Sequence, residues 1–166
     1  MLGIDIAHGI IFQKLFLKNE TRKDNTISQK KIYLLQHLGS DLGYEFYFHW
    51  SIHGPYSHQL SEYMDENYDR LINDNYDVYK LQETTKNNIN RVNKLTEYKR
   101  DELDEASWFI LLSIIVYIYT NKQSWHVNDI NDITETLMKY QHNFNKVQIN
   151  YAFNILIKEN FIDETY

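Results

Sequence analysis

The sequence predicts a mainly α protein: a compact helical domain with a small two-stranded β element, winged-helix-like in part. Three observations lead to this prediction. Apolar residues recur at three- and four-residue spacing over most of the chain, which is typical of amphipathic helices. Two short segments, residues 44–52 and 76–81, instead alternate with period two. One proline and five glycines in 166 residues disfavour a fold of many short strands and tight turns.

The first two helices are separated by a polar segment. Apolar residues at helical spacing predict a helix over residues 4–18, and residues 19–25 (NETRKDN) are charged and predict a break. Either Thr26 or Ser28 can cap the second helix, because a side-chain oxygen can accept a bond from a free backbone N–H of the first turn. Gly39 suits the left-handed position at the helix end.

The two alternating segments enclose a third helix. Aromatic residues occupy every second position of 44–52, and such enrichment favours a strand. Gly54-Pro55 breaks this strand, since the residue before a proline avoids helical angles. Ser57 is a suitable cap for a helix over residues 58–72. We expect the second segment, 76–81, to pair with the first, as in the β element of a winged-helix domain.

The remaining residues predict four more helices. Carboxylates crowd the start of the most apolar one, where they suit the helix dipole, and Asn128 and Asn145 can cap the last two. The expected helices cover residues 86–98, 103–120, 129–140 and 146–159. The chain should form one domain over residues 1–166, and the alternative is a helix-and-strand half, 1–82, beside a helical half, 83–166.

The longest apolar stretch, residues 106–119, is too short to cross a membrane. It has 14 residues, whereas a span needs about 20. The N-terminal residues are apolar but carry Asp5 early and lack a small-residue cleavage site, unlike a signal peptide. We therefore expect a cytoplasmic protein with no membrane partner.

The net charge of −6 is concentrated in the last third of the chain. Residues 101–166 contain four basic and ten acidic side chains, while residues 1–57 have a net charge of +1. A nucleic-acid-binding protein normally has a basic face, because contacts to phosphates supply much of its affinity. A basic surface is expected only near the N-terminus, at Lys14, Lys18, Arg22, Lys23, Lys30 and Lys31.

Motifs for catalysis are missing from the sequence. The lack of cysteine excludes disulfides, iron–sulfur clusters, cysteine zinc sites and a cysteine nucleophile. Glycine-rich phosphate loops, HExxH and GxSxG are also missing. We expect no enzyme and no cofactor. Two alternatives stay open: a metal site in which the turn at Pro55 brings His53 near His58, and a small hydrolase or nuclease that uses His53.

One motif has a familiar arrangement. The chain reads QKKIYLLQ over residues 29–36, GYEF over 43–46 and IHGPYSHQL over 52–60. This pattern resembles the YwgA-like group of small prokaryotic proteins and, more distantly, the Panacea (SocA-like) antitoxin domain. The specific match covers about residues 26–72. The chain departs from the pattern at Ser28, where an apolar residue is usual, and at His58, where proline is common.

The resemblance implies an interaction module with no catalytic residues, associated with toxin–antitoxin or phage-defence settings. Its motif residues are expected to be architectural: the Gly-Pro pair forms the turn, and Ser57 caps the following helix. The structural candidates are Gln29, Tyr33, Gly54, Pro55, Ser57 and Leu60. The candidates for binding a protein partner gather around the aromatic strand: Tyr47, His49, His53, Tyr56 and Tyr63.

Two functions are therefore compared. The first is a non-enzymatic protein-binding module, antitoxin-like or defence-associated, which holds a toxin, a nuclease or a defence-complex subunit. It would use the aromatic face around GPYS and the acidic C-terminal part. The second is a winged-helix-like DNA-binding transcriptional regulator. It would use residues 22–31, or the last two helices as a helix-turn-helix with Gln148, Asn150, Asn154 and Lys158 exposed on the reading helix.

Overall fold

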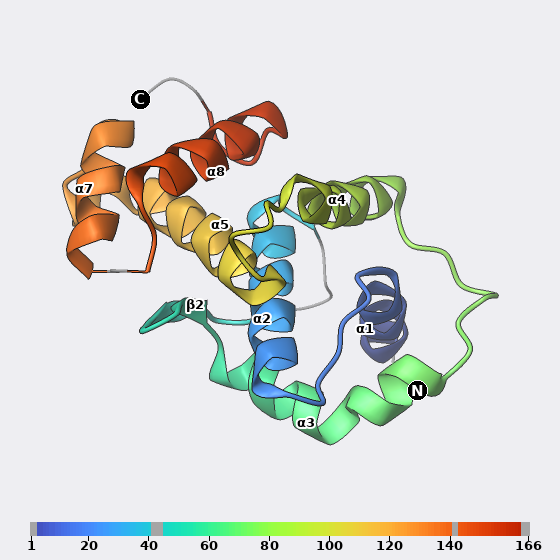
Figure 1. Cartoon of the computed structure of the whole chain (residues 1–166). Helices are drawn as coiled ribbons and strands as arrows, with labels where there is room; N and C mark the ends of the chain where they lie inside the picture. Colours follow the sequence, from blue (N-terminus) through green and yellow to red (C-terminus); the bar gives the residue numbers. More distant parts are fainter. Residues whose placement is uncertain (1–2, 41–44, 141–142, 164–166) are drawn as a thin grey trace.

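Two central helices organise the molecule: α2 (Arg22–His37) and α5 (Glu105–Thr120) pack against each other (Figure 1). The structure, a computed structural model, describes residues 3–40, 45–140 and 143–163. The described part of the chain is 66% helical, with a small antiparallel sheet, so the expected mainly α fold with a two-stranded β element is confirmed. α5 is apolar on nearly every side and buried along most of its length, which explains its central place.

α1 (Gly3–Lys14) and α3 (His58–Asn73) form a pair on one side of α2 (Figure 1). Gln13 joins them, because its side-chain amide donates to the carbonyls of Leu71 and Ile72 at 3.0 Å. These carbonyls belong to the last turn of α3 and have no partner within the helix. The C-terminus of α3 is therefore fixed by a side chain from α1.

α4 (Glu83–Lys94) continues into a 3-10 turn, η1 (Leu95–Tyr98), and packs on α2. The Arg91 guanidinium on α4 donates to the carbonyls of Glu159 and Asn160, at 3.0 and 2.7 Å. Both carbonyls lie at the end of the last helix, where a cation also suits the helix dipole. α4 thereby connects the first half of the chain to its C-terminal end.

Three helices complete the fold beside α5: α6 (Lys122–Trp125), α7 (Ile130–Tyr140) and α8 (Lys146–Lys158). α7 packs on α8, and both contact α5. Asn145 caps α8 as expected, and a capping box with Gln148 reinforces it. One buried apolar cluster runs through the whole fold, from Ile11 on α1 to Ile162 near the C-terminus.

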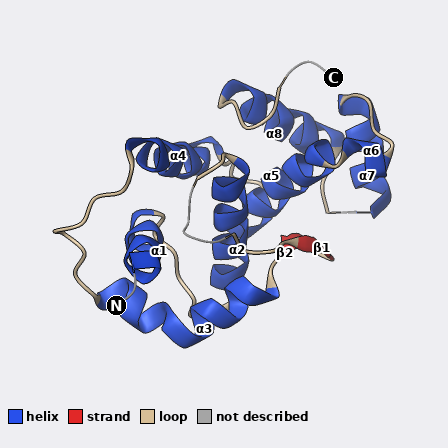
Figure 2. Cartoon of the chain, turned by 180° about the vertical axis from the view of Figure 1, so that it is seen from behind, coloured by secondary structure: helices blue, strands red, loops and turns tan. Residues whose placement is uncertain are grey.

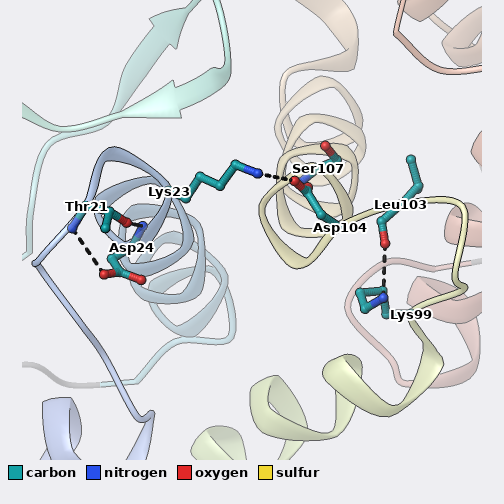
Figure 3. Close-up of polar contacts among 7 residues, drawn as sticks. All are labelled: Thr21, Lys23, Asp24, Lys99, Leu103, Asp104 and Ser107. Carbon is teal, nitrogen blue, oxygen red and sulfur yellow. Dashed lines mark hydrogen bonds and ion pairs between the residues drawn. The ribbon is translucent and has the colours of Figure 1, made fainter.

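The first turns of α2 and α5 are joined by an ion pair (Figure 3). Lys23 Nζ lies 2.8 Å from Asp104 Oδ2, while the other oxygen of this carboxylate accepts the backbone N–H of Ser107 as the cap of α5. Hydrogen bonds from Lys23 and Ser107 hold the pKa of Asp104 at about 2. α2 has its own capping box, in which Thr21 and Asp24 exchange two bonds of 3.1 Å.

This capping box corrects the expected start of the second helix. Residues 22–25 form the first turn of α2, exposed at 22–23 and half-buried at 24–25, and are not part of a polar break, so Thr21 takes the role predicted for Thr26 or Ser28. A run of charged residues indicates contact with solvent, and the first turn of a helix can be in contact with solvent just as a loop can.

The predicted strand at residues 76–81 is wrong. Tyr79 donates its N–H to the carbonyl of Tyr76 at 2.9 Å, and Asp77 donates to the side chain of Asn75, so the segment begins as a turn. The alternation does not correspond to two faces of a strand: the Tyr76 ring is buried against Gly9 of α1, where an added Cβ would lie only 2.1 Å from the ring, whereas residues 77–80 are all exposed.

Residues 121–127, which the expected helices 103–120 and 129–140 left as a connection, contain the one-turn helix α6. Asn121 accepts the backbone N–H of Trp125 at 3.1 Å, and His126 closes the turn in a left-handed conformation. Four residues are too few for a periodic apolar pattern, so the sequence could not reveal this helix.

None of the helices in the described ranges has both the length and the apolar character that crossing a bilayer requires.

Candidate functional site

The candidate site is built on a β-hairpin that protrudes from the α2–α5 pair toward the edge that carries α6 and α7 (Figures 1 and 2). β1 (His49–Ser51) pairs antiparallel with β2 (Gly54–Tyr56), with His49 opposite Tyr56 and Ser51 opposite Gly54. The Ser51 hydroxyl closes the turn by donating to the Gly54 carbonyl at 2.8 Å. The partner of the aromatic strand is therefore the GPY segment itself.

Two neighbouring residues of α2 hold the base of the hairpin. The Gln29 amide is fully buried and binds both backbone groups of Ser57: it donates to the carbonyl at 2.9 Å and accepts the N–H at 3.0 Å. Lys30, only 1% exposed, donates from Nζ to the Pro55 carbonyl at 2.7 Å. Burial lowers the pKa of Lys30 to about 7. Because buried backbone groups need partners, these two residues fix the path of residues 55–57.

Gln36 binds the segment before the hairpin in the same manner. Its side chain accepts the Phe46 N–H at 2.8 Å and donates to the Phe46 carbonyl at 3.0 Å. Gln29 and Gln36 are seven residues apart and so share one face of α2. We call Gln29, Lys30 and Gln36 the α2 clamp. The bonds from Gln36 also explain why β1 is shorter than the strand predicted over residues 44–52. The backbone N–H and carbonyl of Phe46 bond to the Gln36 side chain and not to a neighbouring strand. Tyr44 lies outside the described residues.

Gly54 allows the hairpin to lie directly on α5. Its φ of +86° is left-handed, and an added Cβ would lie 2.6 Å from Cγ1 of Ile114. Only glycine meets both conditions without strain. Ser57 caps α3 as predicted, since its hydroxyl accepts the Leu60 N–H at 3.2 Å, and Leu60 is fully buried. Ser57 thus has the capping role expected for it. Gly54 and Pro55 were expected to form the turn, but they belong to β2, and the turn lies at residues 52–53.

An aromatic ladder extends from the hairpin across four helices, α2, α5, α6 and α7. Trp50 of β1 is its centre: its ring lies 5.5 Å from Tyr117 of α5 and 4.8 Å from Trp125 of α6, measured between centroids. Tyr33 connects Phe48 to Tyr117, and burial raises the pKa of the Tyr33 hydroxyl. The ladder consists of Phe48, Tyr33, Tyr117, Trp50, Trp125 and Tyr140.

Four of the five predicted binding residues lie on or beside the hairpin. Tyr47 is 74% exposed, while its backbone N–H is held by Gln59 at 3.0 Å. His49 is exposed and contacts the half-buried Tyr56 ring at 6.1 Å, and both contact His58. His53 is exposed at the hairpin turn. Tyr47, His49, His53 and Tyr56 therefore gather around one protruding element.

Tyr63 does not belong to this group. Its hydroxyl lies 2.9 Å from Nδ1 of the buried His8, and its ring contacts Phe12 and Phe46. It lies between α1 and α3, inside the aromatic core. Tyr63 is on the apolar side of an amphipathic helix, so its spacing indicated burial more directly than binding.

Sequence reasoning missed three exposed or partly exposed members of this face. Ile52 is 78% exposed at the hairpin turn, and Trp125 and Tyr140 extend the ladder onto α6 and α7. Ile52 is one of the two turn residues, and it was not identified because the sequence predicted a strand that continued through it. Trp125 and Tyr140 follow the hairpin by 69 and 84 positions, counted from Tyr56, and nothing in the sequence connects them to it.

The expected basic surface near the N-terminus is divided among separate interactions. Lys30 is buried beneath the hairpin, and Lys31 is buried with Nζ 3.1 Å from the Leu15 carbonyl and 3.8 Å from Glu105. Lys23 pairs with Asp104. Three of the six basic residues thus cannot offer an unpaired charge to a ligand.

Acidic side chains lie on the helix that carries the end of the ladder. On α7, Asp132 is half-buried and accepts the Asn128 N–H at 2.7 Å, while Glu135 is exposed. Asp129, just before α7, is exposed as well. Within the described ranges, no group of three or more histidine, aspartate or glutamate side chains is placed to hold a metal ion.

Comparisons with protein-family models, with curated proteins and with solved structures gave no match.

Proposed function

We propose that the protein is a non-enzymatic binding module whose hairpin face recognises another protein. This face consists of Tyr47, His49, Ile52, His53 and Tyr56, backed by the aromatic ladder. The observation that carries the proposal is the exposure of Tyr47 and Ile52, at 74% and 78%, on an element whose base is fixed by buried bonds from α2. Rigid, exposed aromatic and aliphatic side chains are typical binding anchors, because they lose little entropy when they bind.

The partner we propose is a basic protein: a toxin, a nuclease or a defence-complex subunit. Support comes from Asp129 and Glu135, which are exposed just before and on α7, the helix that also carries Tyr140 of the ladder. Acidic groups next to an apolar patch steer a basic partner and set its orientation. Membership of the YwgA-like or Panacea group is part of the same proposal, and its support is that Gln29, Gln36 and Gly54 of the shared motif all shape the hairpin.

A second observation supports a role without catalysis. Among the described residues, neither His49 nor His53 has a carboxylate as a hydrogen-bond partner, and both lie on a convex hairpin. General acid–base catalysis by histidine normally relies on such an orienting partner within a cleft. The small hydrolase or nuclease is therefore less well supported.

The proposal is tested by site-specific photocrosslinking in the native host. A benzophenone amino acid at Tyr47 should capture one basic protein, whereas the same group at Asn150, exposed on α8, should not. With the captured protein purified, Ile52→Asp should weaken binding at least tenfold, and Asn150→Asp should have little effect. A partner that crosslinks equally at both positions, or whose affinity Ile52→Asp leaves unchanged, would contradict the proposal.

The DNA-binding alternative has weaker support. The proposed reading helix, α8, exposes Lys146, Asn150, Asn154 and Lys158, but Gln148 is engaged in the capping box. A gel shift on the upstream DNA at about 50 mM salt tests it, because phosphate contacts are strong at low salt. A salt-sensitive shift that Lys146→Glu abolishes would favour this regulator over the binding module.

A further inference from the structure

A second candidate site lies away from the hairpin, where α1, α4 and the loop between α3 and α4 enclose a cavity of about 410 Å³. In Figures 1 and 2 this loop extends outward on the side of the molecule opposite the hairpin. The cavity volume lies within the range of small-molecule sites. Its ligand would bind independently of the proposed hairpin face.

The floor of the cavity is apolar and comes from three elements. Ile10 of α1 and Ile89 of α4 are buried, and Leu81 of the loop is half-buried between them. Tyr79 contributes a half-exposed ring from the loop. An aromatic ring of a ligand can thus lie on aliphatic side chains and against a tyrosine.

Three lysines surround the same cavity: Lys14 at the end of α1, Lys80 in the loop and Lys86 on α4. Lys86 lies 3.7 Å from Glu83, with both side chains well exposed. Among the described residues, Lys14 and Lys80 have no acidic partner, and no acidic residue lines the cavity. Three lysines from three elements therefore line one cavity, in a chain whose net charge is −6.

The three lysines and the apolar floor of the cavity together indicate the class of ligand. Three amines suit a dianion better than a monoanion, because each can donate a charge-assisted bond to a different oxygen. Asn90, also lining the cavity, supplies an amide that can both donate and accept. We propose that this cavity binds an aromatic phosphate monoester such as a nucleoside monophosphate, with the phosphate at Lys14, Lys80 and Lys86 and the ring on the apolar floor.

The test uses the full chain and three probes: AMP, adenosine and inorganic phosphate, titrated by calorimetry or by protein-observed NMR. AMP should bind at least tenfold more tightly than either of the other two, because only AMP has both the ring and the phosphate. A 5′-phosphorylated oligonucleotide shows whether the bound phosphate belongs to a nucleic acid or to a free nucleotide. Tighter binding than AMP assigns the site to a nucleic-acid end, and weaker binding assigns it to the free nucleotide.

Variants separate this site from general charge effects. Lys80→Gln, in an exposed loop, should weaken AMP binding about tenfold, and Tyr79→Ala should weaken AMP but leave phosphate unchanged. Lys146→Gln on α8 is the matched control and should keep the parent affinity. Equal affinity for adenosine and AMP, an equal loss in Lys146→Gln, or no AMP binding at millimolar concentration would overturn the proposal.

Discussion

At the scale of single residues, Gly54 shows how one small side chain positions the proposed binding face. It combines a φ of +86° with an approach to Ile114 that leaves no room for a Cβ. The Gly-Pro pair was expected to form a turn, but Gly54 and Pro55 begin β2 and the hairpin turns at residues 52–53. The close approach to α5 could not be predicted, because the sequence does not show which helix lies beneath a turn.

We predict that Gly54→Ala destabilises the fold by about 2 kcal/mol or more, since it combines left-handed strain with a clash. Chemical denaturation measures this loss. Gly39→Ala is the matched control: its φ of +82° imposes similar strain, but nothing lies within 4 Å of the added Cβ. Gly39→Ala should therefore lose only about 1 kcal/mol. Equal losses in the two variants would mean that contact with Ile114 is unimportant.

Lys30 is the other residue whose environment is unusual. The Lys30 amine is buried and bonded to the Pro55 carbonyl, and its pKa is about 7. It is therefore harder to protonate in the folded state than in the unfolded chain. Between pH 7 and 10 the unfolded chain thus binds more protons, and stability rises with pH. Below the folded pKa both states are protonated, and this dependence ends.

Because stability rises with pH, Lys30 should give the protein a measurable pH dependence of its free energy of unfolding. Relative to Lys30→Met, the parent should gain stability as pH rises from 7 to 10, by up to about 1.4 kcal/mol per pH unit. Urea denaturation at four pH values measures the difference. Lys146→Met removes an exposed lysine. The difference between its free energy of unfolding and that of the parent should stay constant over this pH range, within about 0.5 kcal/mol. A pH-independent difference for Lys30→Met would show that its amine is hydrated.

At the scale of elements, the α2 clamp gives the motif its physical meaning. QKKIYLLQ places Gln29 and Gln36 two turns apart on α2, and each amide binds both backbone groups of one residue in the chain before or after the hairpin. The helix and the aromatic strand were predictable from periodicity, but the hairpin was not, since the strand was expected to pair with residues 76–81. The connection between the helix and residues 46 and 57 was not predictable either, because a glutamine inside a helix is more commonly exposed, and its long-range partner leaves no trace in local spacing.

We predict that Gln29→Leu costs about 2–5 kcal/mol, because two buried backbone groups of Ser57 lose their partner. Gln36→Leu should cost less, since its bonds to Phe46 are only partly buried and water can replace them. Thermal and urea unfolding give the ranking. If Gln36→Leu proved the more damaging of the two, the clamp would act chiefly at Phe46.

At the scale of the whole molecule, the two halves considered in the sequence, 1–82 and 83–166, share one core. α2 from the first half packs along α5 from the second, and the apolar cluster includes both. The sequence indicated the helices of each half but not this pairing, since both helices are apolar and neither specifies its neighbour. The loop that joins the halves exposes residues 77–80.

Limited trypsin digestion should therefore cut first after Lys80, which is exposed outside the helices. We expect the fragments 1–80 and 81–166 to elute together from a size-exclusion column, because separating them would expose the interface between α2 and α5. Fragments that separate and each keep a cooperative unfolding transition would indicate two independent domains.

The contact between Trp50 and Trp125 also gives the molecule an optical signature. The chain has three tryptophans, of which two form this T-shaped pair and the third, Trp108, is buried with its Nε1 bonded to the Leu95 carbonyl at 2.8 Å. Two indoles 4.8 Å apart should couple their electronic transitions and produce a bisignate band in circular dichroism. Trp125→Phe should abolish that band, so a partner that displaces the hairpin could be followed without any added label.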